Sequence, residues 1–165
     1  MKKLLFSAFL LMLSFSVFAQ YGDDDRAFRF GLGGALSLPV GDLKESAVYS
    51  VGFNAQASYS FTESVQGFVQ TGINVFKGEA DYYGESNILH VPIMAGARLN
   101  LSGFLVGAGV GYGLYTADGV SSNGFMYSPK VGYDFGNYEV QFNYTGTSVS
   151  GGTLSYIGLR AFYKF

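Results

Sequence analysis

Few side chains in this sequence could support catalysis. His90 is the only histidine among 165 residues, and there is no cysteine. Covalent catalysis needs a nucleophile beside a base that a third group orients, and a zinc site needs several nitrogen or sulfur ligands. No such set accompanies His90. We predict no catalytic residue, no metal and no cofactor, and we interpret His90 as a hydrogen-bonded interior histidine; a catalytic histidine is the alternative.

Motifs for binding nucleotides or nucleic acids are missing as well. The glycines do not have the spacing of a phosphate loop or of a dinucleotide-binding turn between a strand and a helix. The formal net charge is −2, and the basic residues form no cluster along the chain. Because nucleic-acid-binding domains carry basic patches, we predict no nucleic-acid partner.

Seven charged residues have a shared spacing that could matter chemically. Each lies in an alternating segment, on the row that also holds glycine and small polar residues: Arg29, Arg98, Lys130, Asp134, Glu139, Arg160 and Lys164. Charges taken out of water have to be paired. The seven therefore indicate an internal charge network; the alternative is the lining of an anion-selective pore.

The segments that carry these charges alternate between apolar and polar side chains. At the carboxyl end, every second residue from Ile157 to Phe165 is apolar, whereas the row between them includes Arg160 and Lys164. A period of two is typical of a β-strand with two different faces. Seven further segments alternate in this way, at residues 27–38, 49–61, 65–75, 89–99, 104–114, 125–135 and 138–145.

The distribution of side chains between the two rows indicates which face is inside. A soluble eight-stranded barrel places its apolar row inside. Here the charges share a row with glycines, and the aromatic residues share the other row, which is typical of a barrel in a membrane. Aromatic residues near strand ends predict a girdle at one interface: Phe28, Tyr59, Phe61, Phe104, Phe135, Tyr138, Tyr163 and Phe165. The predicted fold is all-β, an eight-stranded antiparallel up-and-down transmembrane β-barrel.

The lumen of such a barrel is just wide enough for side chains to fill it. We expect the charged residues to do so together with Phe68, Met94, Met126, Tyr156 and Phe162. A small-solute channel is the alternative. Longer connections are predicted after the odd-numbered strands, at residues 39–46, 78–87, 116–123 and 147–152, and short turns after the even-numbered strands. Pro92 predicts a local bulge, since proline removes a ladder donor.

The turn chemistry predicts which charges meet. If Gly136-Asn137 is a two-residue hairpin turn, Asp134 lies opposite Glu139, and both face the lumen. If the connection at residues 147–152 is as short as possible, Arg160 lies beside Glu139. If the register of the last two strands shifts toward the carboxyl end, Lys164 takes that place. Arg29 or Arg98 would reach the same carboxylates from across the lumen.

The first residues have the features of an export signal. Lys2 and Lys3 precede an apolar run, and Val17-Phe18-Ala19 fits a cleavage site. We predict a signal peptide at residues 1–19 and a barrel domain at residues 20–165; an uncleaved anchor is the alternative. The absence of cysteine excludes a lipoprotein leader.

The chain resembles the small eight-stranded outer-membrane β-barrel proteins of Gram-negative bacteria, the OmpX- and OmpA-like, porin-family barrels. The resemblance rests on the glycine-rich first strand leading into residues 38–42 and on the closing residues 156–165. It implies an outer-membrane location, a monomer surrounded by outer-membrane lipid, and recognition of Phe165 by the barrel-assembly machinery. The resemblance says little about activity, so a lipid-acting enzyme remains an alternative.

The predicted loops are acidic, the longest of them most clearly. It carries Glu79, Asp81, Tyr82, Tyr83 and Glu85. These residues predict a possible surface-binding loop. Plain solubility of an exposed loop is the alternative.

Overall fold

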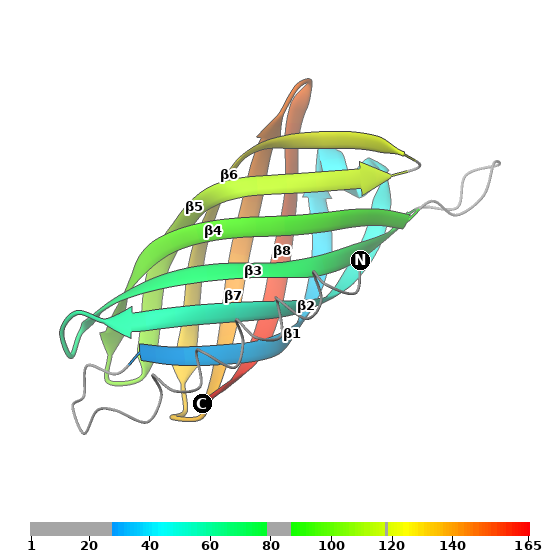
Figure 1. Ribbon diagram of the computed structural model, residues 1–165. Coiled ribbons are helices and arrows are strands. Elements are labelled where there is room, and N and C mark those ends of the chain that lie inside the picture. The colour runs from blue at the N-terminus through cyan, green and yellow to red at the C-terminus, as the bar shows by residue number, and fades with distance from the viewer. Residues whose placement is uncertain (1–27, 79–86, 118) are drawn as a thin grey trace, which may run out of the picture.

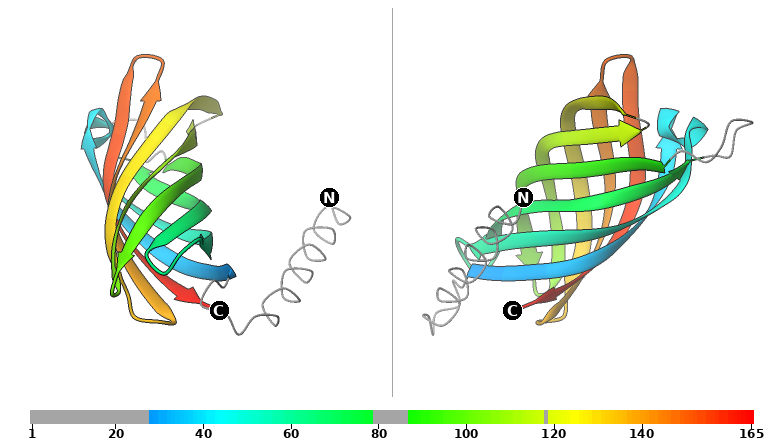
Figure 2. Two further views of the ribbon diagram at one scale, coloured as in Figure 1. Left: turned by 90° about the vertical axis from the view of Figure 1, so that its left-hand side faces the viewer. Right: turned by 45° about the vertical axis from the view of Figure 1, so that its right-hand side comes forward.

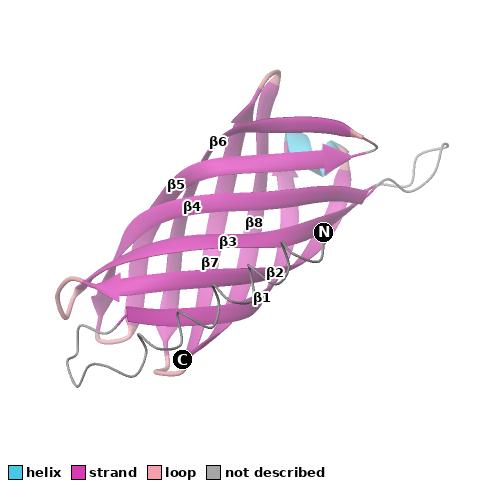
Figure 3. Cartoon of the chain, viewed as in Figure 1, coloured by secondary structure: helices cyan, strands magenta, loops and turns pink. Residues whose placement is uncertain are grey.

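The computed structural model describes residues 28–78, 87–117 and 119–165, which form a closed barrel of eight antiparallel strands (Figure 1). Each strand pairs with its neighbours in sequence, and the first pairs with the last. The strands are β1 (Phe28–Gly41), β2 (Ala47–Ser60), β3 (Val65–Gly78), β4 (Asn87–Leu101), β5 (Phe104–Ala117), β6 (Val120–Asp134), β7 (Tyr138–Val149) and β8 (Gly152–Lys164). One short 3-10 helix, η1 (Asp42–Glu45), follows β1 (Figure 3). The predicted fold class is confirmed.

Two predicted segments fall outside the described residues, namely the signal peptide at residues 1–19 and the acidic loop at residues 79–86. Both stay predictions. Among the described residues, no helix is long and apolar enough to cross a membrane.

Pairing between β1 and β8 closes the sheet. Their register runs from Gly31 opposite Lys164 to Gly41 opposite Leu154. The seam continues to the carboxyl end, where the N–H of Phe165 donates to the carbonyl of Phe30 at 2.9 Å. The two strands lie side by side along most of their length, and all strands run obliquely around the barrel (Figure 2). Closure leaves no edge strand with unpaired backbone groups.

The alternation of side chains decides which row faces out. The apolar row of each strand is exposed, as Leu36 on β1, Phe53 on β2 and Ile93 on β4 illustrate. The opposite row is largely buried and holds the glycines and polar residues. The predicted inside-out arrangement is therefore correct, apart from Arg29, which is exposed near the start of β1.

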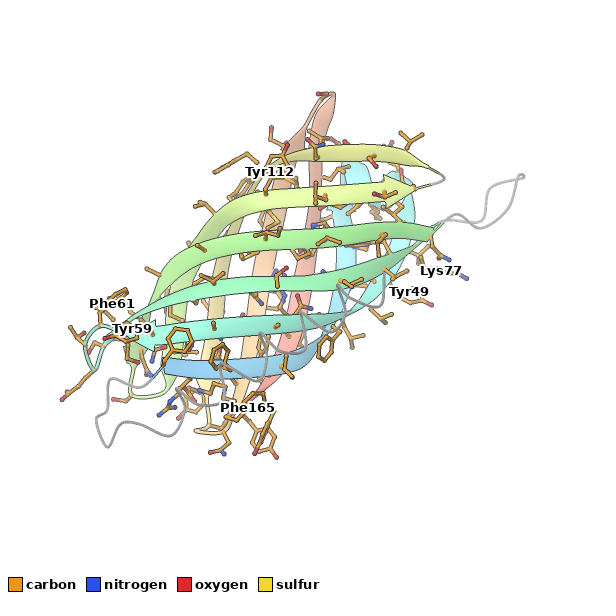
Figure 4. All side chains as sticks on the ribbon, in the orientation of Figure 1. Tyr49, Tyr59, Phe61, Lys77, Tyr112 and Phe165 are labelled. Atoms are coloured by element: carbon orange, nitrogen blue, oxygen red, sulfur yellow. The ribbon has the colours of Figure 1, made fainter. Side chains whose placement is uncertain are left out.

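The end of the barrel that carries Phe28 and Phe165, called here the terminal end, has a ring of exposed aromatic side chains. All eight predicted girdle residues are exposed. Several contact one another edge to face, including Tyr59 with Phe61 and Tyr138 with Tyr163. Tyr59, Phe61 and Phe165 lie at this end, whereas Tyr49 and Lys77 lie at the opposite, loop end (Figure 4). Aromatic side chains arranged in this way are typical of a membrane–water interface.

Two of the predicted long connections are wrong. Thr116 pairs with Ser121 between β5 and β6, and Thr147 pairs with Leu154 between β7 and β8. The serine, threonine and glycine residues there resemble a loop in composition. They nevertheless continue the ladder, because backbone pairing does not require apolar side chains once the strand extends beyond the apolar belt. Only residues 118–119 and 150–151 separate these strands.

The predicted bulge at Pro92 is also wrong. Pro92 pairs with Gly113 of β5, and the register between β3 and β4 has the same offset before and after it, from Thr71–Ile93 to Asn74–His90. Next to Pro92, the Thr71 hydroxyl donates to the Pro92 carbonyl at 2.9 Å. The proline therefore removes one backbone N–H donor from the ladder but does not shift the register of the strand. A register shift between β2 and β3 occurs elsewhere, between Ala47 and Tyr49.

Gly33 allows β1 and β8 to approach closely at the seam. A Cβ atom at this position would lie 2.0 Å from the carbonyl oxygen of Ala161 and 2.9 Å from the Cα of Phe162. Both are backbone atoms of β8, so no side-chain rotation can relieve the contact. At the adjacent Gly34, the nearest atom is the Gly52 carbonyl oxygen at 4.0 Å.

We expect Gly33→Ala to weaken barrel closure, whereas Gly34→Ala on the same strand should not. The added methyl group would force the seam apart, and overpacking of this kind costs about 1–3 kcal/mol. The measurement is the urea midpoint of unfolding, followed by circular dichroism and by the gel shift between unboiled and boiled samples. Equal midpoints for the two variants would contradict the assigned contact.

Candidate functional site

The lumen holds the candidate site, and its buried side chains form three layers along the barrel axis. The layer nearest the terminal end contains the carboxylates. A middle layer contains two further cations among apolar side chains. The layer at the loop end is aromatic. Each layer is supplied by inward-facing residues of strands distant in sequence.

The first layer, called here the carboxylate cluster, consists of Arg98, Asp134, Glu139 and Lys164. Arg98 Nη1 donates to Glu139 Oε1 at 2.5 Å, and Lys164 Nζ lies 3.5 Å from Glu139 Oε2. Lys164 also forms an ion pair with Asp134. The predicted two-residue turn is the reason the two carboxylates meet, since Asp134 lies opposite Glu139 in the ladder.

Neutral amides add hydrogen bonds to Oε1 of Glu139, whose side chain is fully buried. Gln56 Nε2 and Gln141 Nε2 donate to Glu139 Oε1 at 3.2 and 2.5 Å. Gln66 accepts from Arg98 Nε at 2.8 Å. We did not assign a role to these glutamines from the sequence. Their position on inward rows at the height of the charges was the signal that could have found them.

The predicted partner of Glu139 is wrong in one respect. Arg160 lies opposite Gln141, and Glu139 lies opposite Phe162. Arg160 does face the lumen and is 1% exposed, but it does not contact either carboxylate. Arg98 and Lys164 hold the carboxylates instead. The difference arises because the turn between β7 and β8 is at residues 150–151, one residue later than the centre of the predicted loop, which shifts the partner of Glu139 by two residues.

Arg29 does not join the network. It is exposed near the terminal end, and its carbonyl accepts a hydrogen bond from the Ser58 hydroxyl at 3.5 Å. The inward row reaches the mouth of the barrel there, so an arginine on that row faces water rather than the lumen.

The middle layer contains Lys130 and Arg160, both linked to Gln70. Lys130 Nζ and Arg160 Nη1 donate to Gln70 Oε1 at 2.8 and 3.2 Å. Lys130 Nζ also lies 4.0 Å from the centre of the Phe68 ring. Phe68, Met94 and Met126 form an apolar cluster around this layer.

The loop end of the lumen is closed by an aromatic plug, formed by Leu43, Ala47, Phe76, Tyr115 and Tyr156. Leu43 comes from η1 and is 1% exposed, so this short helix caps the mouth of the barrel. From the sequence, residues 39–46 were expected to be only a loop. A single leucine in a polar segment was too weak a signal to predict a cap.

His90 belongs to this aromatic plug rather than to a hydrogen-bonded network. Its ring stacks on Tyr115 with centroids 4.2 Å apart, and it meets Phe76 and Tyr156 at 6.1 and 5.6 Å. Neither imidazole nitrogen has a hydrogen-bond partner among the described residues. The interpretation of His90 as a hydrogen-bonded histidine is therefore wrong.

We expect Glu139→Gln to lower the unfolding midpoint strongly, because it leaves Arg98 and Lys164 buried with one carboxylate fewer. Breaking a buried ion pair costs about 3–5 kcal/mol. Urea unfolding in detergent micelles, followed by circular dichroism, measures the effect. Glu63→Gln in the exposed turn after β2 is the matched control, and equal midpoints for the two variants would disprove the role of the cluster.

Comparison of the sequence with known protein families and with curated proteins finds no match. Solved structures do resemble it. The crystal structure of Ail, the attachment invasion locus protein of Yersinia pestis, with the heparin analogue sucrose octasulfate is 16% identical, covers 84% of this chain and 97% of that chain, and has a TM-score of 0.57.

Two further structures have the same architecture. A de novo designed transmembrane β-barrel is 12% identical over 87% of this chain and 100% of that chain, with a TM-score of 0.53. The N-terminal β-barrel domain of Pseudomonas aeruginosa OprF is 11% identical over 83% of this chain and 97% of that chain, with a TM-score of 0.51. The chain therefore has the fold of the small eight-stranded outer-membrane β-barrels.

Proposed function

We propose that this protein is a non-enzymatic barrel of the Gram-negative outer membrane, with a filled lumen that does not conduct and a structural or surface-interaction role. The observation that carries the proposal is the filling of the lumen. Three layers of buried side chains occupy it from Glu139 near the terminal end to Leu43 at the loop end.

The exterior supports a membrane location. Outward side chains are apolar along every strand, and an aromatic ring borders the belt at the terminal end. A soluble protein rarely exposes a contiguous apolar surface of this extent. Hydrocarbon around the belt would remove that surface from water, and closure of the ladder leaves no backbone edge exposed to lipid.

The loop end is the surface we propose for interaction. In the described residues it presents Asp42 and Glu45 beside Lys44, and the sequence adds Glu79, Asp81 and Glu85. The structure of Ail contains a heparin analogue, which is a polyanion. Like charges repel, so these acidic residues favour a partner with a basic surface over a sulfated sugar.

Conductance in planar lipid bilayers tests the filled lumen. The folded protein should give no stable, large conductance, because buried side chains fill the lumen, among them Phe162, Arg160, Met126 and Tyr156. An open porin in the same bilayers controls for insertion and detection. Steady open channels would reject the proposal in favour of the small-solute channel.

Recognition by the barrel-assembly machinery is a second part of the proposal, and Phe165 is the residue that tests it. Its backbone bonds to Phe30 across the seam, whereas its side chain is 59% exposed. Phe165→Ala keeps the backbone bonds of the seam and removes only the ring.

We expect Phe165→Ala to reduce the amount of folded protein in outer-membrane fractions several-fold, while refolding of the purified variant in detergent is unchanged. Phe61→Ala is the control, since Phe61 is a girdle residue with a similar exposure of 58%. An equal loss for both variants, or no loss for Phe165→Ala, would argue against a terminal recognition signal.

A further inference from the structure

The buried charges of the lumen do not balance. Arg98 and Lys164 are matched in number by Asp134 and Glu139, with which they form ion pairs. The carboxylate cluster is therefore neutral as a unit. Lys130 and Arg160 are buried too, and neither contacts a carboxylate in the described chain. The middle layer thus carries two cations without an anion.

The polar groups of the middle layer converge on one place. Gln70 Oε1 accepts from both Lys130 and Arg160, so the two cationic groups share a single acceptor oxygen atom. That amide oxygen is neutral, and it is the acceptor for two charges at once. Two further contacts of the cations are with the Met94 sulfur, 3.7 Å from Lys130 Nζ, and with the Tyr156 hydroxyl, 3.3 Å from Arg160 Nη2.

Two donors of the same group are left without a partner. Arg160 Nε and Gln70 Nε2 are buried, and neither has a hydrogen-bond acceptor among the described residues. The Arg160 side chain as a whole is among the most buried in the molecule, at 1% exposure. An N–H group without an acceptor in such a position is costly.

Proton loss can neutralise a buried lysine but not a buried arginine, because a guanidinium keeps its proton in proteins. The charge of Arg160 therefore has to be compensated by another group. We propose that a small monovalent anion of the halide class binds in the middle layer, held by the Arg160 guanidinium, Lys130 Nζ and the Gln70 amide.

The surroundings favour a small ion over a phosphate. Phe68, Met94 and Met126 enclose the layer with apolar side chains. A large oxyanion has more acceptor oxygen atoms than the donors in this layer can satisfy. A halide needs only a few N–H donors, and Arg160 Nε and Gln70 Nε2 are two buried donors without an acceptor among the described residues.

Thermal unfolding of the full mature protein in detergent micelles tests the site, with circular dichroism as the readout because the chain has no tryptophan. Sodium chloride and sodium bromide are compared with sodium gluconate at equal ionic strength. We expect a saturable rise of the midpoint in chloride and bromide, since a ligand that binds only the folded state stabilises it by mass action. Arg160→Gln should weaken the apparent affinity for chloride at least tenfold.

Lys44→Gln in the exposed η1 is the control, and its chloride response should equal that of the wild type. If the unfolding midpoint of Arg160→Gln differs between chloride and gluconate as much as that of the wild type, the difference is a general salt effect and overturns the proposal. If Arg160→Gln does not fold, bromide-soaked crystals of the wild type decide the question. An anomalous peak between Arg160 and Lys130 is expected there, and a lumen without one would reject the site.

Discussion

Every backbone N–H and C=O group that faces hydrocarbon has to find its partner within the protein, because the bilayer offers none. In this chain the pairing of β1 with β8 satisfies that requirement, and it ends with the reciprocal contact between Phe30 and Phe165. Closure by eight strands also fixes the width of the barrel. The narrow lumen, the need for glycine at the seam and the crowding of the interior all follow from it.

A narrow interior changes the chemistry of the side chains that point into it. Glu139 is fully buried, yet it has two cations and two glutamine amides around it. Arg160 lies in the same interior but has no carboxylate beside it, because its neighbours are an amide, a tyrosine hydroxyl and apolar groups. On the inward row of β8, Lys164 thus belongs to a balanced set of charges, whereas Arg160 belongs to an unbalanced one.

The two ends of the lumen are closed by different means. At the terminal end, ion pairs and amides fill the space between strands. At the loop end, rings from β3, β5 and β8 pack around His90 of β4, and Leu43 of η1 covers them. A histidine in that position is a packing residue, since stacking on Tyr115 replaces the hydrogen bonds that an imidazole would make in water.

The sequence by itself determined the number of strands, the face of nearly every residue and the pairing of Asp134 with Glu139, because each depends on alternation or on a two-residue turn. It did not determine where β5 to β8 end, since serine, threonine and glycine serve a loop and a solvated strand equally well. It placed Arg160 beside Glu139 because the centre of the predicted loop lies one residue before the turn at residues 150–151. Tertiary structure alone decided the partners in the lumen: an inward side chain meets residues from across the barrel, and register, tilt and closure set those distances together. Arg98 reaches Glu139, and Leu43 reaches the aromatic plug, through contacts that no local pattern encodes.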